Sequence, residues 1–349
     1  MKLLAPLLAV LMTTPLVADT WTRLTPDEAR MGNAVIAVDP RAPYTLYADA
    51  WDVSGLGKST DGGRTWTVLP HDFRRELLRT IVVELSGPDR VTVMTWDSSD
   101  VVLHRSIDGG MTWARYKMDS PIIGLASDLA VDPQNSSTLY VGHPRSCFTT
   151  CIEGSGGVSK STDGGRRWVA LYKGIAANQV IIDPHGSGTI YAVGDTSRRS
   201  QNGGASWTNI VAPPGETIFR IGLDPVLPGV LYAITEREHL WRSDDRGENW
   251  QKLGAPFSYF QPWTIAIDPV RRGVIVVGGS SGHGAQRSMD GGLTWLPLNE
   301  GLPIPQNGTQ LDWVRPVFAT NGRLYASGSV HGAMTLQEPP KPRRRAVRH

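Results

Sequence analysis

Short apolar runs alternate with turn sequences along most of the chain. A run such as residues 35–38 ends at an Asp-Pro pair and is followed by a second apolar run that contains Leu46 and Tyr47. Five such pairs occur, at Asp39-Pro40, Asp132-Pro133, Asp183-Pro184, Asp224-Pro225 and Asp268-Pro269. Short apolar runs bounded by turn residues are typical of β-strands. Each unit therefore predicts two antiparallel strands joined by a turn.

An octapeptide of the type Ser-Thr-Asp-Gly-Gly-Arg-Thr-Trp follows the strand pairs. Six copies occur, and their tryptophans stand 47, 55, 39, 43 and 45 residues apart. The third residue of the copies is Asp61, Asp108, Asp163, Asn202, Asp245 and Asp290. Repeats of about 40 to 50 residues are typical of propeller blades, each a four-stranded antiparallel sheet. The pattern predicts an all-β propeller.

Seven blades follow from counting the degenerate units. Residues 80–93 and 317–326 resemble the strand pairs but lack the Asp-Pro turn. Residues 21–26 resemble the segment that follows an octapeptide, so we expect this N-terminal strand to close the last blade. Such closure removes exposed sheet edges. We expect one propeller over residues 19–338, preceded by a signal peptide over 1–18 and followed by a disordered basic tail over 339–349.

Each residue type of the octapeptide has a structural role in a hairpin tip. Two glycines supply positive φ at no steric cost. The Ser hydroxyl and the Asp carboxylate can hydrogen-bond to the backbone of the same turn. The Trp ring can pack between strands. We therefore interpret the six acidic or amide positions as structural.

Composition and charge narrow the function classes. The chain has 38 Gly, 25 Pro and 12 Trp among 349 residues, which excludes a coiled coil and predicts frequent turns. Of 35 Lys and Arg, five lie in the last ten residues and one is Lys2, so the body carries 29 cations against 33 anions, a net charge of −4. A weakly acidic body argues against a nucleic-acid-binding protein.

The first residues and the cysteines indicate an extracytoplasmic location. Residues 1–18 combine one cation, an apolar run and a small-residue cleavage site, as in a cleaved secretory leader, and the run is too short for stable membrane insertion. The two cysteines, Cys147 and Cys151, favour a disulfide in an oxidising compartment. A zinc site needs four ligands and only His143 is near, so we expect neither a metal nor a cofactor. The predicted location is secreted or periplasmic.

The octapeptide resembles the Asp-box, or bacterial neuraminidase repeat. This repeat occurs in sialidases, two-propeller xyloglucanases, sortilin-type receptors and a photosystem II assembly factor. The resemblance covers nearly the whole expected propeller and implies that the boxes are structural and lie away from the ligand face. Because the superfamily contains enzymes, receptors and assembly factors, the resemblance leaves the function open.

Four tryptophans lie outside the repeat in segments that we expect to be loops on the ligand face. They are Trp51, Trp96, Trp263 and Trp313, which could form flat surfaces for a ligand such as a sugar. Carboxylates accompany three of them, at Asp52, Asp97 and Asp312, and paired carboxylates are required for glycoside hydrolysis. Residues 52–56 resemble the Asp-x-Gly-Gly stretch of xyloglucanases, which implies a catalytic Asp52; Ser54 departs from that pattern.

Three arginines precede innermost strands and could approach the mouth of the central channel. They are Arg79, Arg220 and Arg315, and clustered guanidinium groups bind carboxylates or phosphates. Sialidases use an arginine triad in such a position, and residues 219–222 resemble their Phe-Arg-Ile-Pro motif, with Gly222 in place of Pro. By counting residues, Arg220 is shifted by one position relative to the other two, which predicts a different facing.

These observations favour a secreted propeller that binds a glycan or protein ligand on its loop face without catalysis. One alternative is a glycoside hydrolase, exo-sialidase-like or xyloglucanase-like, that uses Asp52 with Asp97 or Asp312. A second alternative is an assembly factor that docks a partner through the three arginines. The sequence leaves the oligomeric state open.

Overall fold

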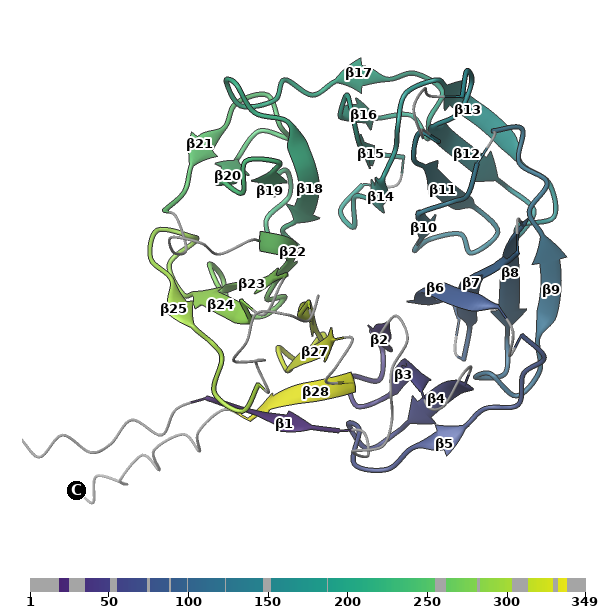
Figure 1. Cartoon of the computed structure of the whole chain (residues 1–349), viewed down its shortest axis with the longest axis horizontal. Coiled ribbons are helices and arrows are strands. Elements are labelled where there is room, and N and C mark those ends of the chain that lie inside the picture. The colour runs from purple at the N-terminus through teal and green to yellow at the C-terminus, as the bar shows by residue number, and fades with distance from the viewer. Residues whose placement is uncertain are drawn as a thin grey trace, which may run out of the picture.

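The computed structural model describes residues 19–24, 35–50, 55–73, 76–87, 89–98, 100–122, 124–146, 152–186, 188–254, 262–280, 283–302, 313–328 and 332–337. Within these residues the chain forms seven four-stranded antiparallel sheets arranged around a central axis, as Figure 1 shows. The prediction of a seven-bladed propeller is confirmed. The described residues contain no helix that is long and apolar enough to cross a membrane.

The first three blades follow the order of the chain. Blade 1 consists of β2 (Ile36–Val38), β3 (Leu46–Ala50), β4 (Gly55–Ser59) and β5 (Thr67–Val68). Blade 2 consists of β6 (Leu77–Val83), β7 (Val91–Asp97), β8 (Asp100–Ser106) and β9 (Ala114–Lys117). Blade 3 consists of β10 (Asp128–Val131), β11 (Leu139–His143), β12 (Gly157–Ser161) and β13 (Val169–Lys173).

The next three blades have the same order. Blade 4 consists of β14 (Gln179–Ile182), β15 (Ile190–Val193), β16 (Arg198–Ser200) and β17 (Thr208–Asn209). Blade 5 consists of β18 (Ile218–Leu223), β19 (Leu231–Thr235), β20 (Leu240–Ser243) and β21 (Gln251–Lys252). Blade 6 consists of β22 (Pro262–Ile267), β23 (Ile275–Gly279), β24 (Ala285–Ser288) and β25 (Leu296–Pro297).

Blade 7 joins the two ends of the fold. It consists of β26 (Arg315–Phe318), β27 (Leu324–Gly328), β28 (Gly332–Gln337) and β1 (Thr20–Arg23), with β1 paired to β28. Trp21 is buried and its indole N–H donates to the carbonyl oxygen of Leu298 in blade 6 at 2.7 Å. An ion pair between Asp19 and Arg287 adds to this contact. The N-terminal strand closes the ring, as the sequence predicts.

The hydrophobic core lies between neighbouring blades. The buried clusters combine residues of adjacent sheets, for example Leu56 and Leu69 of blade 1 with Ile81 and Val93 of blade 2. Five second strands place a buried tyrosine here, at Tyr47, Tyr140, Tyr191, Tyr232 and Tyr325. The Tyr140 hydroxyl donates to the Gly203 carbonyl oxygen of blade 4 at 3.3 Å. The repeated Leu-Tyr and Ile-Tyr pairs therefore join blades.

Each octapeptide forms the tip between the third and fourth strands of its blade. In the first copy the Gly63 N–H donates to the Ser59 hydroxyl at 2.8 Å, and this hydroxyl donates to the Asp61 carboxylate at 2.8 Å. The Asp61 carboxylate also accepts the N–H of Thr65 at 2.9 Å. Gly62 and Gly63 have φ of 76° and 90°. The same bonds recur in the other copies, which gives the motif a structural explanation.

Candidate functional site

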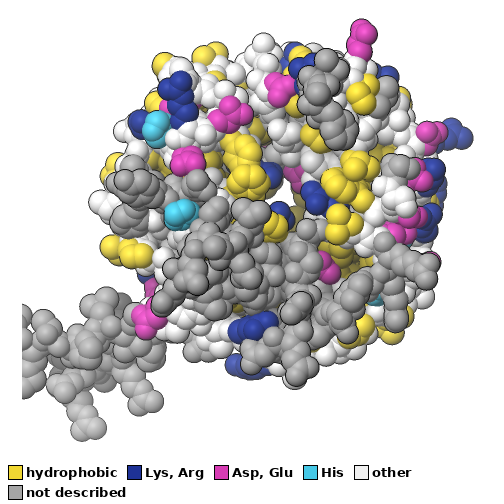
Figure 2. Space-filling model, viewed as in Figure 1, with side chains coloured by type: hydrophobic (Ala, Val, Ile, Leu, Met, Phe, Trp, Pro, Cys, Tyr) yellow, Lys and Arg dark blue, Asp and Glu magenta, His cyan; other side chains and the backbone are white. Residues whose placement is uncertain are grey.

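A cavity of about 470 Å³ lies where the innermost strands of the blades meet at the channel mouth. Figure 2 views the molecule down this axis and shows a central hollow with basic and hydrophobic side chains at its edge. The innermost strands contribute mostly consecutive residues to it. The lining is Arg79, Thr80, Ser127, Asp128, Asn178, Gln179, Arg220, Ile221, Trp263, Thr264, Ile265, Trp313 and Arg315.

One residue of each innermost strand occupies an equivalent position around the axis. It stands four residues before the Asp of the Asp-Pro pair, or before Glu84 and Ala319 in the two blades without that pair. The strand pairing places six of these residues at the same level in each sheet. Val35 directly precedes β2, and its carbonyl oxygen accepts the Asp49 N–H at 3.0 Å, which continues the pairing of β2 with β3 to the same level. This axial ring consists of Val35, Thr80, Asp128, Gln179, Arg220, Thr264 and Arg315.

The register corrects the expectation that Arg220 is shifted. Arg220 and Arg315 both belong to the axial ring, and Arg79 stands one residue earlier in its strand. A β-bulge between Leu78 and Thr80 inserts Arg79 as an extra residue. Because a bulge re-aims the inserted side chain, Arg79 reaches the cavity despite its displacement. Phe219 and Trp263 are the extra residues of similar bulges in β18 and β22.

Three members of the axial ring connect neighbouring blades. The Asp128 carboxylate accepts the Val180 N–H of blade 4 at 3.0 Å. The Gln179 side chain exchanges two hydrogen bonds with the backbone of Ile221 in blade 5, at 2.9 and 3.1 Å. The Thr264 hydroxyl donates to the carbonyl oxygen of Val314 at 3.2 Å. These side chains have a structural role.

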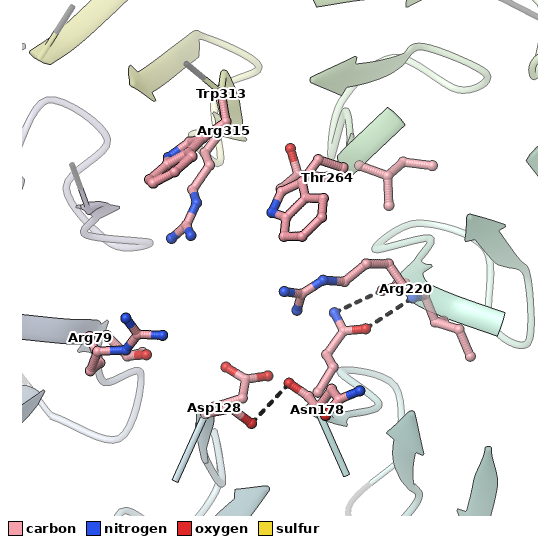
Figure 3. A pocket seen from close by; sticks show the side chains of 13 residues that line it. Arg79, Asp128, Asn178, Arg220, Thr264, Trp313 and Arg315 are labelled. Carbon is pink, nitrogen blue, oxygen red and sulfur yellow. Dashed lines mark hydrogen bonds between the residues drawn. The ribbon is translucent and has the colours of Figure 1, made fainter. Parts of the chain in front are cut away.

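The three arginines have no such role within the described residues. The Nε atoms of Arg79, Arg220 and Arg315 are buried without a hydrogen-bond partner, and these side chains form no ion pair in the described part of the chain. Figure 3 shows their guanidinium groups pointing into one space from three sides. They line the cavity and remain available to a ligand.

Aromatic rings hold the three guanidinium groups in place. The Cζ atom of Arg79 lies 4.1 Å from the ring centroid of Trp96, that of Arg315 lies 5.4 Å from Trp313, and that of Arg220 lies 5.4 Å from Phe219. Such cation–π contacts orient a cation and leave its N–H donors free. The arrangement is preorganised for an anion.

The cavity carries an excess of positive charge. Among the described residues of its lining, three arginines and one carboxylate, Asp128, give a net charge of 3 − 1 = +2. Burial, together with the nearby positive charges of Arg220 and Arg79, lowers the pKa of Arg315 to about 10. Burial likewise lowers the pKa values of Arg79 and Arg220. All three remain charged at neutral pH, and their mutual repulsion favours binding of an anion.

The candidate tryptophans lie in different surroundings. Trp263 and Trp313 line the cavity, whereas Trp96 lies behind Arg79 and donates its indole N–H to the Ala126 carbonyl oxygen at 2.9 Å. Trp96 lies in β7 and Trp263 lies in β22, so the expectation that both lie in loops is wrong. The first three strands of blade 2 have seven residues each and β22 contains a bulge, which extends both sheets to these positions. Trp51 lies outside the described residues.

The candidate carboxylates are only partly described. Asp97 ends β7 and pairs with Arg115 at 2.9 Å, away from the cavity lining. Asp52 and Asp312 lie outside the described residues, as do Cys147 and Cys151. No cluster of three or more His, Cys, Asp or Glu side chains suited to a metal ion occurs among the residues that the structure describes.

Sequence reasoning missed Asp128, Gln179 and Thr264. Each is a single polar residue in an otherwise apolar strand. Because such residues are common in strands, they gave no signal of a site. The signal that identifies them is their constant spacing from the Asp-Pro pairs. Aligning the strand pairs on that Asp brings the whole axial ring together.

Comparisons with known proteins agree with a propeller. The model of a family described as "Sortilin, neurotensin receptor 3," matches residues 195–307. A xyloglucanase of Hypocrea jecorina is 26% identical over 258 residues, which cover 58% of this chain and 30% of the relative. A xyloglucanase of a Paenibacillus species is 23% identical over 320 residues, which cover 73% of this chain and 30% of the relative. The chain thus spans less than a third of the length of these two relatives.

Solved structures share the fold at low identity. YCF48 from Cyanidioschyzon merolae superposes with a TM-score of 0.66 at 16% identity and covers 91% of this chain and 99% of its own. YCF48 bound to D1 peptide superposes with a TM-score of 0.67 at 16% identity, and the match covers 92% of this chain and 97% of that chain. The GH74 enzyme of Niastella koreensis gives 0.67 at 17% identity and covers 90% and 53%. These similarities show that the chain shares the β-propeller fold with these proteins.

Proposed function

We propose that this propeller is a non-catalytic binding module that receives the anionic part of a ligand at the channel mouth. The observation that carries the proposal is the convergence of Arg79, Arg220 and Arg315 on one cavity with unpartnered Nε atoms. A cavity of about 470 Å³ falls in the range of ligand sites, about 300–1,000 Å³. A guanidinium group can bind a carboxylate or a phosphate through two parallel hydrogen bonds.

The cavity lacks the chemistry of glycoside hydrolysis among its described residues. Hydrolysis needs two carboxyl groups about 5 to 9.5 Å apart. Asp128 is the one carboxylate in the lining, and it accepts the N–H groups of Leu129 and Val180 at 3.1 and 3.0 Å. A carboxylate held by two backbone donors in a net positive site is a structural group rather than a nucleophile.

Binding of sulfate, followed by isothermal titration calorimetry, tests the proposal. Each of R79Q, R220Q and R315Q is expected to weaken sulfate binding about 10- to 100-fold, because a hydrogen bond to a charged group contributes about 1.5–3 kcal/mol. Arg198→Gln is the matched control: Arg198 also stacks on an aromatic ring, Tyr172, and has a buried unpartnered Nε, but lies outside the cavity lining. Equal effects of R315Q and R198Q would refute the proposal.

The class of ligand separates the two alternatives. The xyloglucanase relatives favour a glycoside hydrolase that uses Asp52, and YCF48 bound to D1 peptide favours a protein segment as the ligand. A screen with fluorogenic glycosides, repeated with Asp52→Asn, addresses the first. Turnover by the wild type that this variant lacks would replace binding by catalysis as the function. The second alternative, a protein segment as the ligand, is tested by comparing the binding of the wild type and of R315Q on a peptide array and on a glycan array. Peptides that bind the wild type and not R315Q would support it.

We also infer that the octapeptides are structural Asp-boxes, that the chain is secreted and that Cys147 pairs with Cys151. The hydrogen bonds within the octapeptide tips support the first inference. The leader-like residues 1–18 and the two cysteines support the others. Thiol titration of the purified protein under denaturing conditions, with and without reductant, tests the disulfide.

A further inference from the structure

A second cavity of about 250 Å³ adjoins the channel mouth on the side of blades 7, 1 and 2. The two cavities share Arg79, Thr80, Asp128 and Arg315, so one space continues into the other. The side cavity is otherwise lined by aliphatic residues and one hydroxyl. These residues are Val35, Ile36, Ile81, Pro316, Val317 and Ser327.

The side cavity opens where the axial ring changes character. Six members of the ring are polar or charged, and Val35 of blade 1 is the exception. Val35 lies between the ring positions of blades 7 and 2, which Arg315 and Thr80 occupy. The ring therefore contains two cations, Arg220 and Arg315, and one aliphatic gap at Val35. This gap lies beside Arg315 of the ring and beside Arg79, which the bulge of β6 adds from the preceding position.

A buried hydroxyl faces this side cavity without a partner. Ser327 in β27 is 2% exposed, and its hydroxyl oxygen has no hydrogen-bond partner among the described residues. It lies opposite Arg315 in the strand pairing. An unpaired buried hydroxyl costs about 1–3 kcal/mol, so a partner supplied by a ligand would remove an existing penalty.

We propose that the site selects a small organic acid whose anionic group lies among the arginines and whose apolar body, carrying one hydrogen-bonding group, fills the side cavity. This inference rests on the proposed function and specifies its ligand. A free inorganic anion would leave the aliphatic lining unused, and a neutral sugar would leave three guanidinium groups unpaired.

The volume of the side cavity limits the size of the apolar body. A buried apolar cavity of about 150 Å³ is large enough to hold benzene. A space of about 250 Å³ therefore accepts a group somewhat larger than a benzene ring or a short alkyl chain. The rest of a longer acyl chain would extend beyond this cavity.

A series of straight-chain carboxylates from acetate to hexanoate tests the inference by isothermal titration calorimetry. Each buried CH₂ contributes about 0.8 kcal/mol, so the affinity is expected to rise about fourfold per carbon until the side cavity is full. Hexan-1-ol, the neutral analogue of hexanoate, is expected to bind much more weakly. An affinity that stays flat from acetate to hexanoate would overturn the inference.

Two variants locate the alkyl chain. Val35→Phe narrows the gap and is expected to abolish the rise along the series while acetate binding stays unchanged, which also shows that the variant is folded. Hexanoate offers no partner to the Ser327 hydroxyl and leaves the existing penalty unchanged, so Ser327→Ala is expected to bind hexanoate as tightly as the wild type does. It is expected to bind 6-hydroxyhexanoate, which can supply a partner, about fivefold more weakly than the wild type does. Ser197→Ala is the matched control, since Ser197 is also buried with an unpartnered hydroxyl but lies outside both cavities.

The two proposals fail in different ways. If acetate and sulfate bind in an Arg315-dependent manner but the series is flat, the organic-acid inference is wrong and the anion-binding function stands. If Arg315→Gln changes the binding of no probe, the anion-binding function is wrong as well. A series that rises equally in the wild type and in Val35→Phe would place the alkyl chain elsewhere and also overturn the inference.

Discussion

Asp128 determines how strongly the three arginines can attract an anion. Burial raises the pKa of its carboxyl group, and the nearby Arg220 opposes that rise. In its ionised form Asp128 cancels one of the three positive charges that line the cavity. The residue therefore both joins blade 3 to blade 4 and limits the affinity of the site.

Asp128→Asn is expected to bind sulfate more tightly than the wild type at neutral pH, because the net charge of the cavity lining rises from +2 to +3. In the wild type, sulfate affinity is expected to increase as the pH falls through the raised pKa of Asp128, above the usual value of 3.8. Calorimetry between pH 7 and pH 4 measures both effects. A pH dependence that persists in the variant would show that another group is responsible.

At the scale of elements, the innermost strand combines two roles in one position. Gln179 and Thr264 use it to bond the next blade, whereas Arg220 and Arg315 at the same level form no such bond to a described residue and face the cavity. The bulge in β6 adds Arg79 from the preceding level. Function can therefore change by substitution in one blade, because the remaining blades keep the ring closed.

The octapeptide tips predict a loss of stability in acid. Hydrogen bonds from Thr294, Ser288 and the backbone lower the pKa of Asp290 to about 2, and Asp245 is lowered to about 2 in the same way. A carboxyl group whose pKa is lower in the folded state stabilises the fold above its ordinary pKa, about 3.9, and this contribution is lost as the pH falls toward 2. The free energy of unfolding should therefore decrease between about pH 4 and pH 2.

The fourth tip supplies the control for this prediction. Asn202 makes the same contacts with an amide, accepting the Ser206 N–H at 2.8 Å, so an amide fits the turn. Asp290→Asn should weaken the dependence of unfolding on pH below 4, and Asn202→Asp should strengthen it. Urea denaturation at pH 3 and pH 6 compares the variants. If the free energy of unfolding changes equally between pH 3 and pH 6 in the wild type and both variants, the octapeptide carboxylates do not cause the loss of stability in acid.

Much of this element-scale picture was predictable from the sequence. The repeated Asp-Pro pairs and octapeptides predict the blades, and Trp21 predicts the closing strand. The facing of Arg79 was not predictable, because a bulge depends on the pairing with β7 and leaves no fixed residue pattern. The side cavity was also not predictable, since it requires three sheets to meet and only their packing brings Val35 beside Arg315.

At the scale of the whole molecule, β1 holds the ring closed. It covers the outer edge of β28, and its Trp21 is 3% exposed in the cluster between blades 6 and 7. The cluster also contains Leu298 and Leu336. Closure of the ring fixes the distance between the innermost strands, on which the convergence of the arginines depends.

Trp21→Ala is expected to destabilise the fold by about 3–5 kcal/mol, because it leaves a large cavity in this cluster. It also removes the hydrogen bond to Leu298. Urea denaturation measures the change, and hydrogen exchange should increase first at β28. Protection of β28 that matches the wild type would show that the closing strand holds without the tryptophan.

The single aliphatic member of the axial ring has a geometric consequence. Seven similar blades around one axis give a ligand at the channel mouth seven rotational orientations with similar surroundings. Val35 makes one of these orientations different from the other six, and the uneven distribution of the arginines around the axis also breaks the sevenfold symmetry. A ligand with a charged group at one end and an apolar group at the other can contact the arginines and Val35 in one orientation. A nearly symmetric fold can therefore bind an asymmetric ligand in a unique orientation.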